Sequence, residues 1–77
     1  MPLGVTISED EVNFSVAVPE GKECRLLLYR AGESEPCAAY PMDMAVGEVR
    51  YLALKGLAPS DYEYNYMIDG EVVADPY

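Results

Sequence analysis

Two segments of the chain repeat a large apolar side chain at every second position, which is the period of a β-strand. Residues 12–18 place an apolar side chain at every second position: Val12, Phe14, Val16 and Val18. Residues 62–68 do the same with larger side chains: Tyr62, Tyr64, Tyr66 and Ile68. Successive side chains of a strand point to opposite faces, so each segment predicts a strand with one buried face. We therefore expect Tyr64 and Tyr66 in a core.

Further short β-rich segments, separated by turn residues, extend this pattern along the chain. They are residues 4–8, 24–30, 38–44, 49–54 and 71–74. Pro41 indicates an edge strand, and Asp69-Gly70 is a strong two-residue hairpin signal. No segment has a sustained apolar period of 3.6, so we expect no substantial helix. The prediction is an all-β, immunoglobulin-like antiparallel sandwich of about seven short strands.

One segment departs from the alternation, because Leu26, Leu27 and Leu28 are consecutive. A sandwich core buries only every second residue of a strand. The run therefore predicts a strand that is buried on both faces, either as a central strand or under a neighbouring domain.

The charge of the chain excludes several classes of partner. The 77 residues include 14 acidic and 5 basic side chains, no His and no Trp, with a net charge of −9. Nucleic-acid binding depends on Lys and Arg, so we expect no nucleic-acid partner. Anionic membrane surfaces are excluded for the same reason, and no apolar run is long enough to span a bilayer. The first residues have no basic or apolar stretch, so we expect no signal peptide.

The two cysteines, Cys24 and Cys37, fall in a predicted hairpin in which Arg30 faces about Cys37 and Cys24 faces about Asp43. This register separates the thiols by about six residues of strand at about 3.3 Å each. A disulfide needs Cα atoms within about 7 Å, so we expect two free thiols. Free thiols fit a reducing compartment, and the cytoplasm is the expected location, with a secreted parent protein as the alternative.

Catalytic and metal sites are not expected in this chain. The acidic clusters at residues 9–11 and 33–35 lie in turn-like segments, where charges are usually solvated. A cysteine nucleophile needs a base, usually His, and none exists. Asp69 and Glu71 flank Gly70 without the spacing of a calcium loop. We therefore predict no catalytic residue, no metal ligand and no cofactor.

The tyrosines are the informative candidates for binding. A sugar has apolar faces and a polar rim, and a Tyr offers a flat ring with a hydroxyl group. Tyr40 and Tyr51 are less constrained by the core pattern than the tyrosines of residues 62–68, so we expect them at the surface. With Asn65 they are the candidate carbohydrate-binding residues.

Four sequence blocks follow one another along the chain. The first block is Leu3-Gly4-Val5-Thr6 followed by Val12-Asn13-Phe14-Ser15-Val16 and Pro19. The others are Gly56-Leu57-x-Pro59, then Tyr64-x-Tyr66 with Asp69-Gly70, and finally Asp75-Pro76-Tyr77. In this order the blocks resemble the N-terminal early-set domain of the pullulanase, isoamylase and glycogen-debranching enzymes, grouped as carbohydrate-binding module family 48. The resemblance runs over the full length, and the terminal block is the most specific.

The resemblance implies a division of the chain and a role. Residues 1–74 would be the early-set module, and residues 75–77 the start of a linker to a catalytic barrel that is absent here. The parent would be a family 13 glycoside hydrolase that cleaves α-1,6 bonds of glycogen, starch or pullulan, with its catalytic residues in the barrel. The module would pack on that barrel, and it holds α-glucan in some members.

The sequence also departs from the family. Glycan-binding members use tryptophans and a lysine at the sugar face, whereas this chain has no Trp. Met67 stands where many members have Arg, and Ser60-Asp61 follows Pro59 in place of Gly. These departures favour a packing role for the module. Two alternatives stay open: an autonomous α-glucan-binding module, and a fibronectin III-like adhesion domain.

Overall fold

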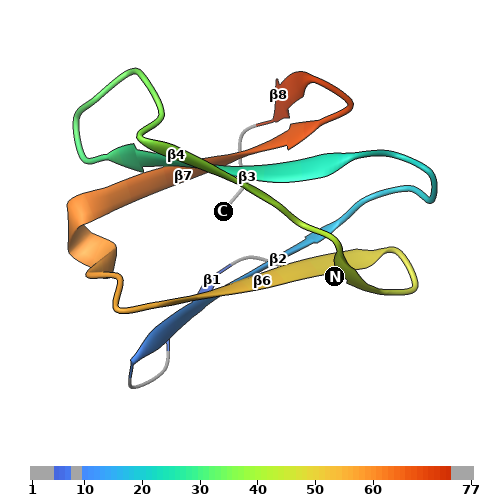
Figure 1. The fold of residues 1–77 in the computed structure, drawn as a ribbon, viewed down its shortest axis with the longest axis horizontal. Coiled ribbons are helices and arrows are strands. Elements are labelled where there is room, and N and C mark those ends of the chain that lie inside the picture. The colour runs from blue at the N-terminus through green and yellow to red at the C-terminus, as the bar shows by residue number, and fades with distance from the viewer. Residues whose placement is uncertain (1–4, 8–9, 74–77) are drawn as a thin grey trace.

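The computed structural model describes residues 5–7 and 10–73, and in this part of the chain it is an all-β sandwich of two antiparallel four-stranded sheets (Figure 1). The strands are β1 (Val5–Ile7), β2 (Glu11–Ala17), β3 (Cys24–Arg30), β4 (Ala38–Pro41), β5 (Met44–Val46), β6 (Val49–Lys55), β7 (Tyr62–Ile68) and β8 (Glu71–Val73). A single 3-10 turn, Pro59–Asp61, precedes β7 among the described residues. The predicted fold class is confirmed.

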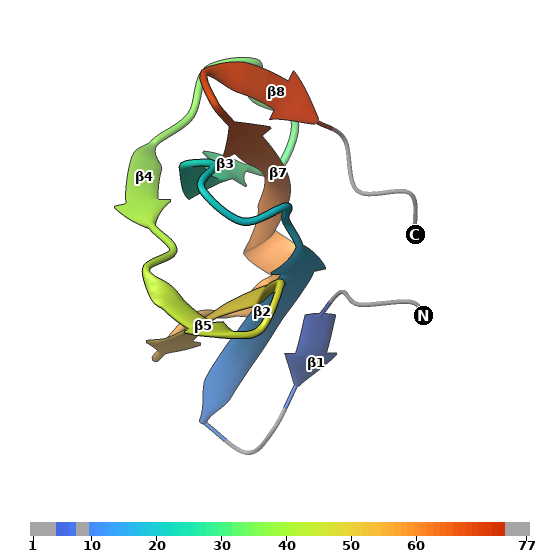
Figure 2. The ribbon, with the colours of Figure 1, turned by 90° about the vertical axis from the view of Figure 1, so that its right-hand side faces the viewer.

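The first sheet has the strand order β1-β2-β6-β5, and the second has the order β4-β3-β7-β8. Figure 2 shows β1 and β8 on one side of the sandwich, and β4 and β5 on the other. The β7–β8 hairpin turns at Asp69-Gly70 with φ angles of 50° and 82°, as the hairpin signal predicts.

The segment 38–44, predicted as one strand, is instead divided between the two sheets. Ala38–Pro41 pairs with β3, whereas Met44–Val46 pairs with β6. Pro41 has no N–H group to extend the ladder, and the chain crosses to the other sheet directly after it. Met42 lies at the crossing and is fully buried, so its side chain fills the space between the sheets.

The core forms between the inner faces of the two sheets. Its fully or almost fully buried members are Val12, Phe14, Val18, Cys24, Leu26, Met42 and Tyr66. The rings of Phe14 and Tyr64 meet edge to face at 5.2 Å, and those of Tyr64 and Tyr66 at 5.6 Å. The prediction that Tyr64 and Tyr66 belong to the core is confirmed.

The three consecutive leucines are all buried, with at most 5% of any side chain exposed. Leu26 and Leu28 face the core beside Tyr66 and Tyr64, whereas Leu27 lies on the outer face between Ala39 and Asn65. The prediction of burial on both faces is therefore confirmed for this central strand. Leu27 is covered by side chains of its own chain, so its burial does not require a neighbouring domain.

Two predicted features lie outside the described residues. They are the Leu3-Gly4 start of the first block and the predicted linker at residues 75–77. Within residues 5–7 and 10–73, no helix is long and apolar enough to cross a membrane.

Candidate functional site

The three residues predicted to bind carbohydrate lie on three different faces of the sandwich. Tyr40 is opposite Leu26 in β3 and packs against the core, so it is not the exposed residue that we expected. Tyr51 is opposite Ser15 and Met44 on the outer face of the first sheet. Asn65 is opposite Leu27 on the outer face of the second sheet. The structure therefore does not bring the three into one site.

Asn65 instead belongs to a hollow of about 420 Å³ on the outer face of the second sheet, which we call the β3–β7 hollow. Strands β3 and β7 supply its floor, and the loop between β3 and β4 supplies one wall. Its lining residues are Tyr29, Glu33, Ser34, Glu63, Tyr64 and Asn65.

Tyr29 and Asn65 are joined by a hydrogen bond, in which Asn65 Nδ2 donates to the Tyr29 hydroxyl at 3.2 Å. Both side chains are half-buried, and Tyr29 is opposite Glu63 in the ladder. With this bond made, the Tyr29 hydroxyl can still donate its proton outward, and the Asn65 carbonyl oxygen can still accept.

The β3–β7 hollow therefore combines the Tyr29 ring with several groups that form hydrogen bonds, whereas the Tyr64 ring packs in the core against Phe14 and Tyr66. The carboxylates of Glu33 and Glu63 are exposed acceptors, and the Ser34 hydroxyl can donate and accept. This mixture suits a ligand with hydroxyl groups around an apolar face, because the ring packs on the face while the polar groups meet the rim.

Sequence reasoning missed Tyr29 and the loop residues. Tyr29 follows Leu28, so a buried Leu28 places Tyr29 on the outer face by simple alternation. What the sequence does not contain is the pairing of β3 with β7, which brings Tyr29 to Asn65 across 36 positions.

The cysteines are both free, as predicted, but the hairpin register differs by one residue from the prediction. Leu28 faces Ala38, and the Met42 N–H donates to the Cys24 carbonyl at 2.9 Å, so Cys24 faces Met42 rather than Asp43.

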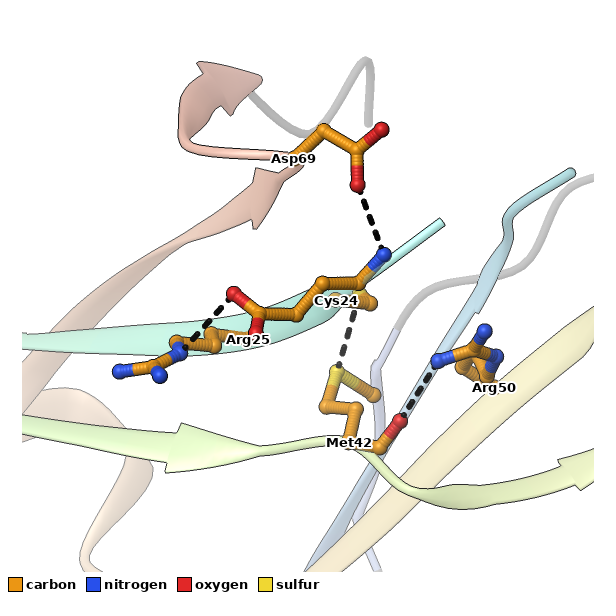
Figure 3. Close-up of polar contacts among 6 residues, drawn as sticks. Cys24, Arg25, Met42, Arg50 and Asp69 are labelled. Atoms are coloured by element: carbon orange, nitrogen blue, oxygen red, sulfur yellow. Dashed lines mark hydrogen bonds and ion pairs between the residues drawn. The ribbon is translucent and has the colours of Figure 1, made fainter. Parts of the chain in front are cut away.

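The Cys24 thiol lies 3.8 Å from the Met42 sulfur (Figure 3). Burial raises the pKa of Cys24, and nearby Arg50 offsets part of this rise. A buried thiol of raised pKa is a poor nucleophile.

Arg50 fixes the crossing between the sheets from the side of β6. Its guanidinium donates to the Met42 carbonyl at 3.1 Å and to the Lys22 carbonyl at 2.7 Å, and the first bond is drawn in Figure 3. Its hydrogen bonds thus go to backbone oxygens of the scaffold. In the described residues, no group of three or more Cys, Asp or Glu side chains could hold a metal ion.

The fold and the β3–β7 hollow together define a small all-β module with a polar surface hollow that contains the Tyr29 ring. The profile of carbohydrate-binding module 48, the isoamylase N-terminal domain, matches residues 2–77. The chain therefore belongs to the family of carbohydrate-binding module 48. No curated protein matches the chain closely enough to count as a relative.

Membership of the family establishes the general role of the chain. The family consists of non-catalytic carbohydrate-binding modules, often found in enzymes of glycogen and starch, so this chain by itself is not an enzyme. Carbohydrate is the ligand class that membership implies. The match also decides against the fibronectin III-like adhesion alternative.

Proposed function

We propose that this chain is the N-terminal accessory module of a debranching hydrolase of pullulanase, isoamylase or glycogen-debranching type. The parent would be a family 13 glycoside hydrolase that cleaves α-1,6 bonds of an α-glucan. The module would pack on its catalytic barrel and hold glucan chains near it. The free thiols support a cytoplasmic parent, because the exposed Cys37 suits a reducing compartment.

The observation that carries the glucan-binding part is the β3–β7 hollow with its Tyr29–Asn65 pair. A glucose unit would lie with its apolar face on the Tyr29 ring. Its hydroxyl groups would bond to the Asn65 amide and to the carboxylates of Glu33 and Glu63. Because the hollow is open and shallow and has one aromatic ring, we expect a weak site for a short stretch of glucan.

The same observation supports a second candidate function, an autonomous module that binds glycogen or starch. Such a module needs the hollow but no catalytic barrel. The two candidates therefore differ in the parent protein rather than in the binding site.

An NMR titration of the chain with maltoheptaose tests the binding site. We expect saturable amide shifts around Tyr29, Ser34 and Asn65. Tyr29→Ala should weaken binding by about two- to tenfold, because a stacking contact of the size found for aromatic pairs, about 0.5–1.5 kcal/mol, corresponds to that factor. Tyr51→Ala is the matched control on the other sheet and should bind as the wild type does.

Amide shifts that cluster around Tyr51 instead would place the sugar on the first sheet and would show that the β3–β7 hollow is not the binding site. A separate assay decides the identity of the parent. The complete product of the gene that encodes this sequence should release reducing sugar from pullulan, and no release from any α-1,6-linked glucan would favour the autonomous module.

A further inference from the structure

Among residues 5–7 and 10–73, no segment closes the side of the sandwich formed by β1 over its core. Val5 is opposite Phe14 and Ile7 is opposite Val12, so both point to the inner face of the first sheet. Phe14 and Val12 are each 2% exposed, whereas Val5 and Ile7 are 39% and 62% exposed. Apolar side chains that face the core and remain this exposed indicate a surface that lacks its cover.

Two adjoining hollows lie at this place, of about 200 Å³ and about 250 Å³. They share Val12, Leu57 and Pro59, and one of them reaches Phe14 and Leu28. We call the surface made by Val5, Ile7, Leu57 and Pro59 above this floor the β1 groove.

The apolar surface continues on the neighbouring strand of the other sheet. Val73 is opposite Tyr66 on the inner face of β8, yet it is 42% exposed, and Val72 is 54% exposed. Figure 2 shows β8 on the same side of the sandwich as β1. Both sheets thus present apolar side chains at this side.

The charges around the β1 groove define the chemistry of what covers it. Asp10 and Glu63 line its two hollows together with Glu11, which is opposite Lys55 in the ladder, and no Lys or Arg lines either hollow in the part of the chain that the structure describes. A second copy of this chain would bring the same acidic rim and a further net charge of −9, so it is disfavoured. The complementary partner has an apolar projection ringed by Lys and Arg.

We propose that the β1 groove is a docking surface for a folded protein domain that inserts an apolar side chain between Ile7 and Leu57 and surrounds it with basic residues. The position of the docking surface and the basic, apolar character of its partner go beyond the proposed function. The identity of the partner rests on the proposed function, which makes the covering domain the hydrolase domain of the same polypeptide. The β1 groove and the β3–β7 hollow adjoin at Glu63 and Tyr64 of β7, which line parts of both, and their other lining residues differ.

Thiol labelling of the complete gene product tests the docking. In a Cys37→Ser background, which removes the exposed native thiol, Ile7→Cys reports on the β1 groove. Val46→Cys is the matched control, because Val46 is 69% exposed on β5 at the other side of the sandwich. The labelling rate with a maleimide is measured for each in the native protein and in urea.

We expect the labelling rate of Ile7→Cys to be at least about tenfold lower in the native protein than in urea. The rates of Val46→Cys in the two conditions should differ by less than about threefold. Raising NaCl from about 0.05 M to about 0.5 M should speed the labelling of Ile7→Cys, because salt screens the contact between the acidic rim and the basic partner.

Three other outcomes would contradict the docking proposal, and they differ in what they mean for the proposed function. Free labelling of Ile7→Cys in a product that hydrolyses pullulan would show that the docking surface is wrong while the proposed function holds. Protection of Val46→Cys instead would place the interface on β5. A product without a further folded domain would overturn both the docking and the hydrolase proposal.

Discussion

At the scale of single residues, Tyr66 connects the two sheets. Its hydroxyl donates to the Ser15 carbonyl at 3.2 Å, and its side chain is 2% exposed. Burial, with a smaller contribution from Cys24, raises the pKa of Tyr66 from 10.0 to about 12. We expect Tyr66→Phe to lower the free energy of unfolding at pH 7 by about 1 kcal/mol, because it removes this hydrogen bond.

The raised pKa gives the wild type a further signature at alkaline pH. The unfolded chain releases the Tyr66 proton near pH 10 and the folded chain near pH 12. The stability that Tyr66 contributes is therefore complete below about pH 10 and is lost as the pH rises towards about 12. Urea unfolding across this window should show the wild type losing its advantage over Tyr66→Phe, and parallel curves for the two proteins would contradict the assignment.

The alternation of side chains along a strand predicts the orientation of some tyrosines and not of others. Alternation along β7 places Tyr64 and Tyr66 in the core, because two apolar tyrosines on one face need no partner strand to be identified. The orientation of Tyr40 depends on its pairing with Leu26, and a one-residue slip in a strand exchanges its two faces. The site pair Tyr29–Asn65 depends on the pairing of β3 with β7, which no local pattern encodes.

At the scale of elements, the crossing from β4 to β5 depends on Met42. Its side chain is fully buried, and its carbonyl accepts a hydrogen bond from Arg50. We expect Met42→Ala to lower the free energy of unfolding by about 2–5 kcal/mol, because it leaves a cavity between the sheets. Met44→Ala is the control: Met44 is 61% exposed, so a change within about 0.5 kcal/mol is expected. Equal losses in urea unfolding would contradict this role of Met42.

The Asp69 side chain ties the β7–β8 turn to the start of β3. The Asp69 carboxylate accepts from the Glu23 N–H at 2.8 Å and lies 3.5 Å from Lys22 Nζ, while its backbone has φ of 50°. Figure 3 shows this contact at the start of β3. We expect Asp69→Ala to cost about 1–2 kcal/mol, since Ala tolerates this φ poorly and cannot accept the bond.

Asp69→Asn separates the contributions at this turn. Asn adopts positive φ readily, and its side-chain oxygen can accept from Glu23, so it loses only the ion pair with Lys22. Exposed ion pairs contribute about 0–1 kcal/mol, so thermal unfolding of Asp69→Asn should stay close to that of the wild type. An Asn variant as unstable as the Ala variant would show that the ion pair matters most.

The elements also show where sequence patterns stop being sufficient. The Asp69-Gly70 turn and the edge position that Pro41 indicates for its strand follow from local chemistry, and both are observed, because β4 lies at the edge of its sheet. The transfer of the chain to the other sheet after Pro41 is not local. It follows from the fit of Met42 into the core, where its sulfur meets Cys24 of β3 and its carbonyl accepts from Arg50 of β6.

At the scale of the whole molecule, the charge opposes folding. A net charge of −9 on a radius of gyration of 11.9 Å makes the exposed carboxylates repel one another. Two ion pairs are seen within the described residues, Lys22–Asp69 and Arg25–Glu23. Salt at about 0.1 M screens charges beyond about 10 Å. We therefore expect Tm at pH 7 to rise as NaCl increases, by about 4–8 °C for each kcal/mol of repulsion removed.

A charge-reduced variant tests whether repulsion is the cause. Glu20, Glu35 and Glu48 are exposed and lie in turns or loops, and none of them lines the β3–β7 hollow, although Glu35 follows Ser34 of its wall. Replacing all three by Gln removes three negative charges without changing the core. This variant should start from a higher Tm in low salt and should gain less from added NaCl than the wild type. An equal gain in both proteins would mean that salt acts through apolar burial instead, because that effect does not depend on the number of carboxylates.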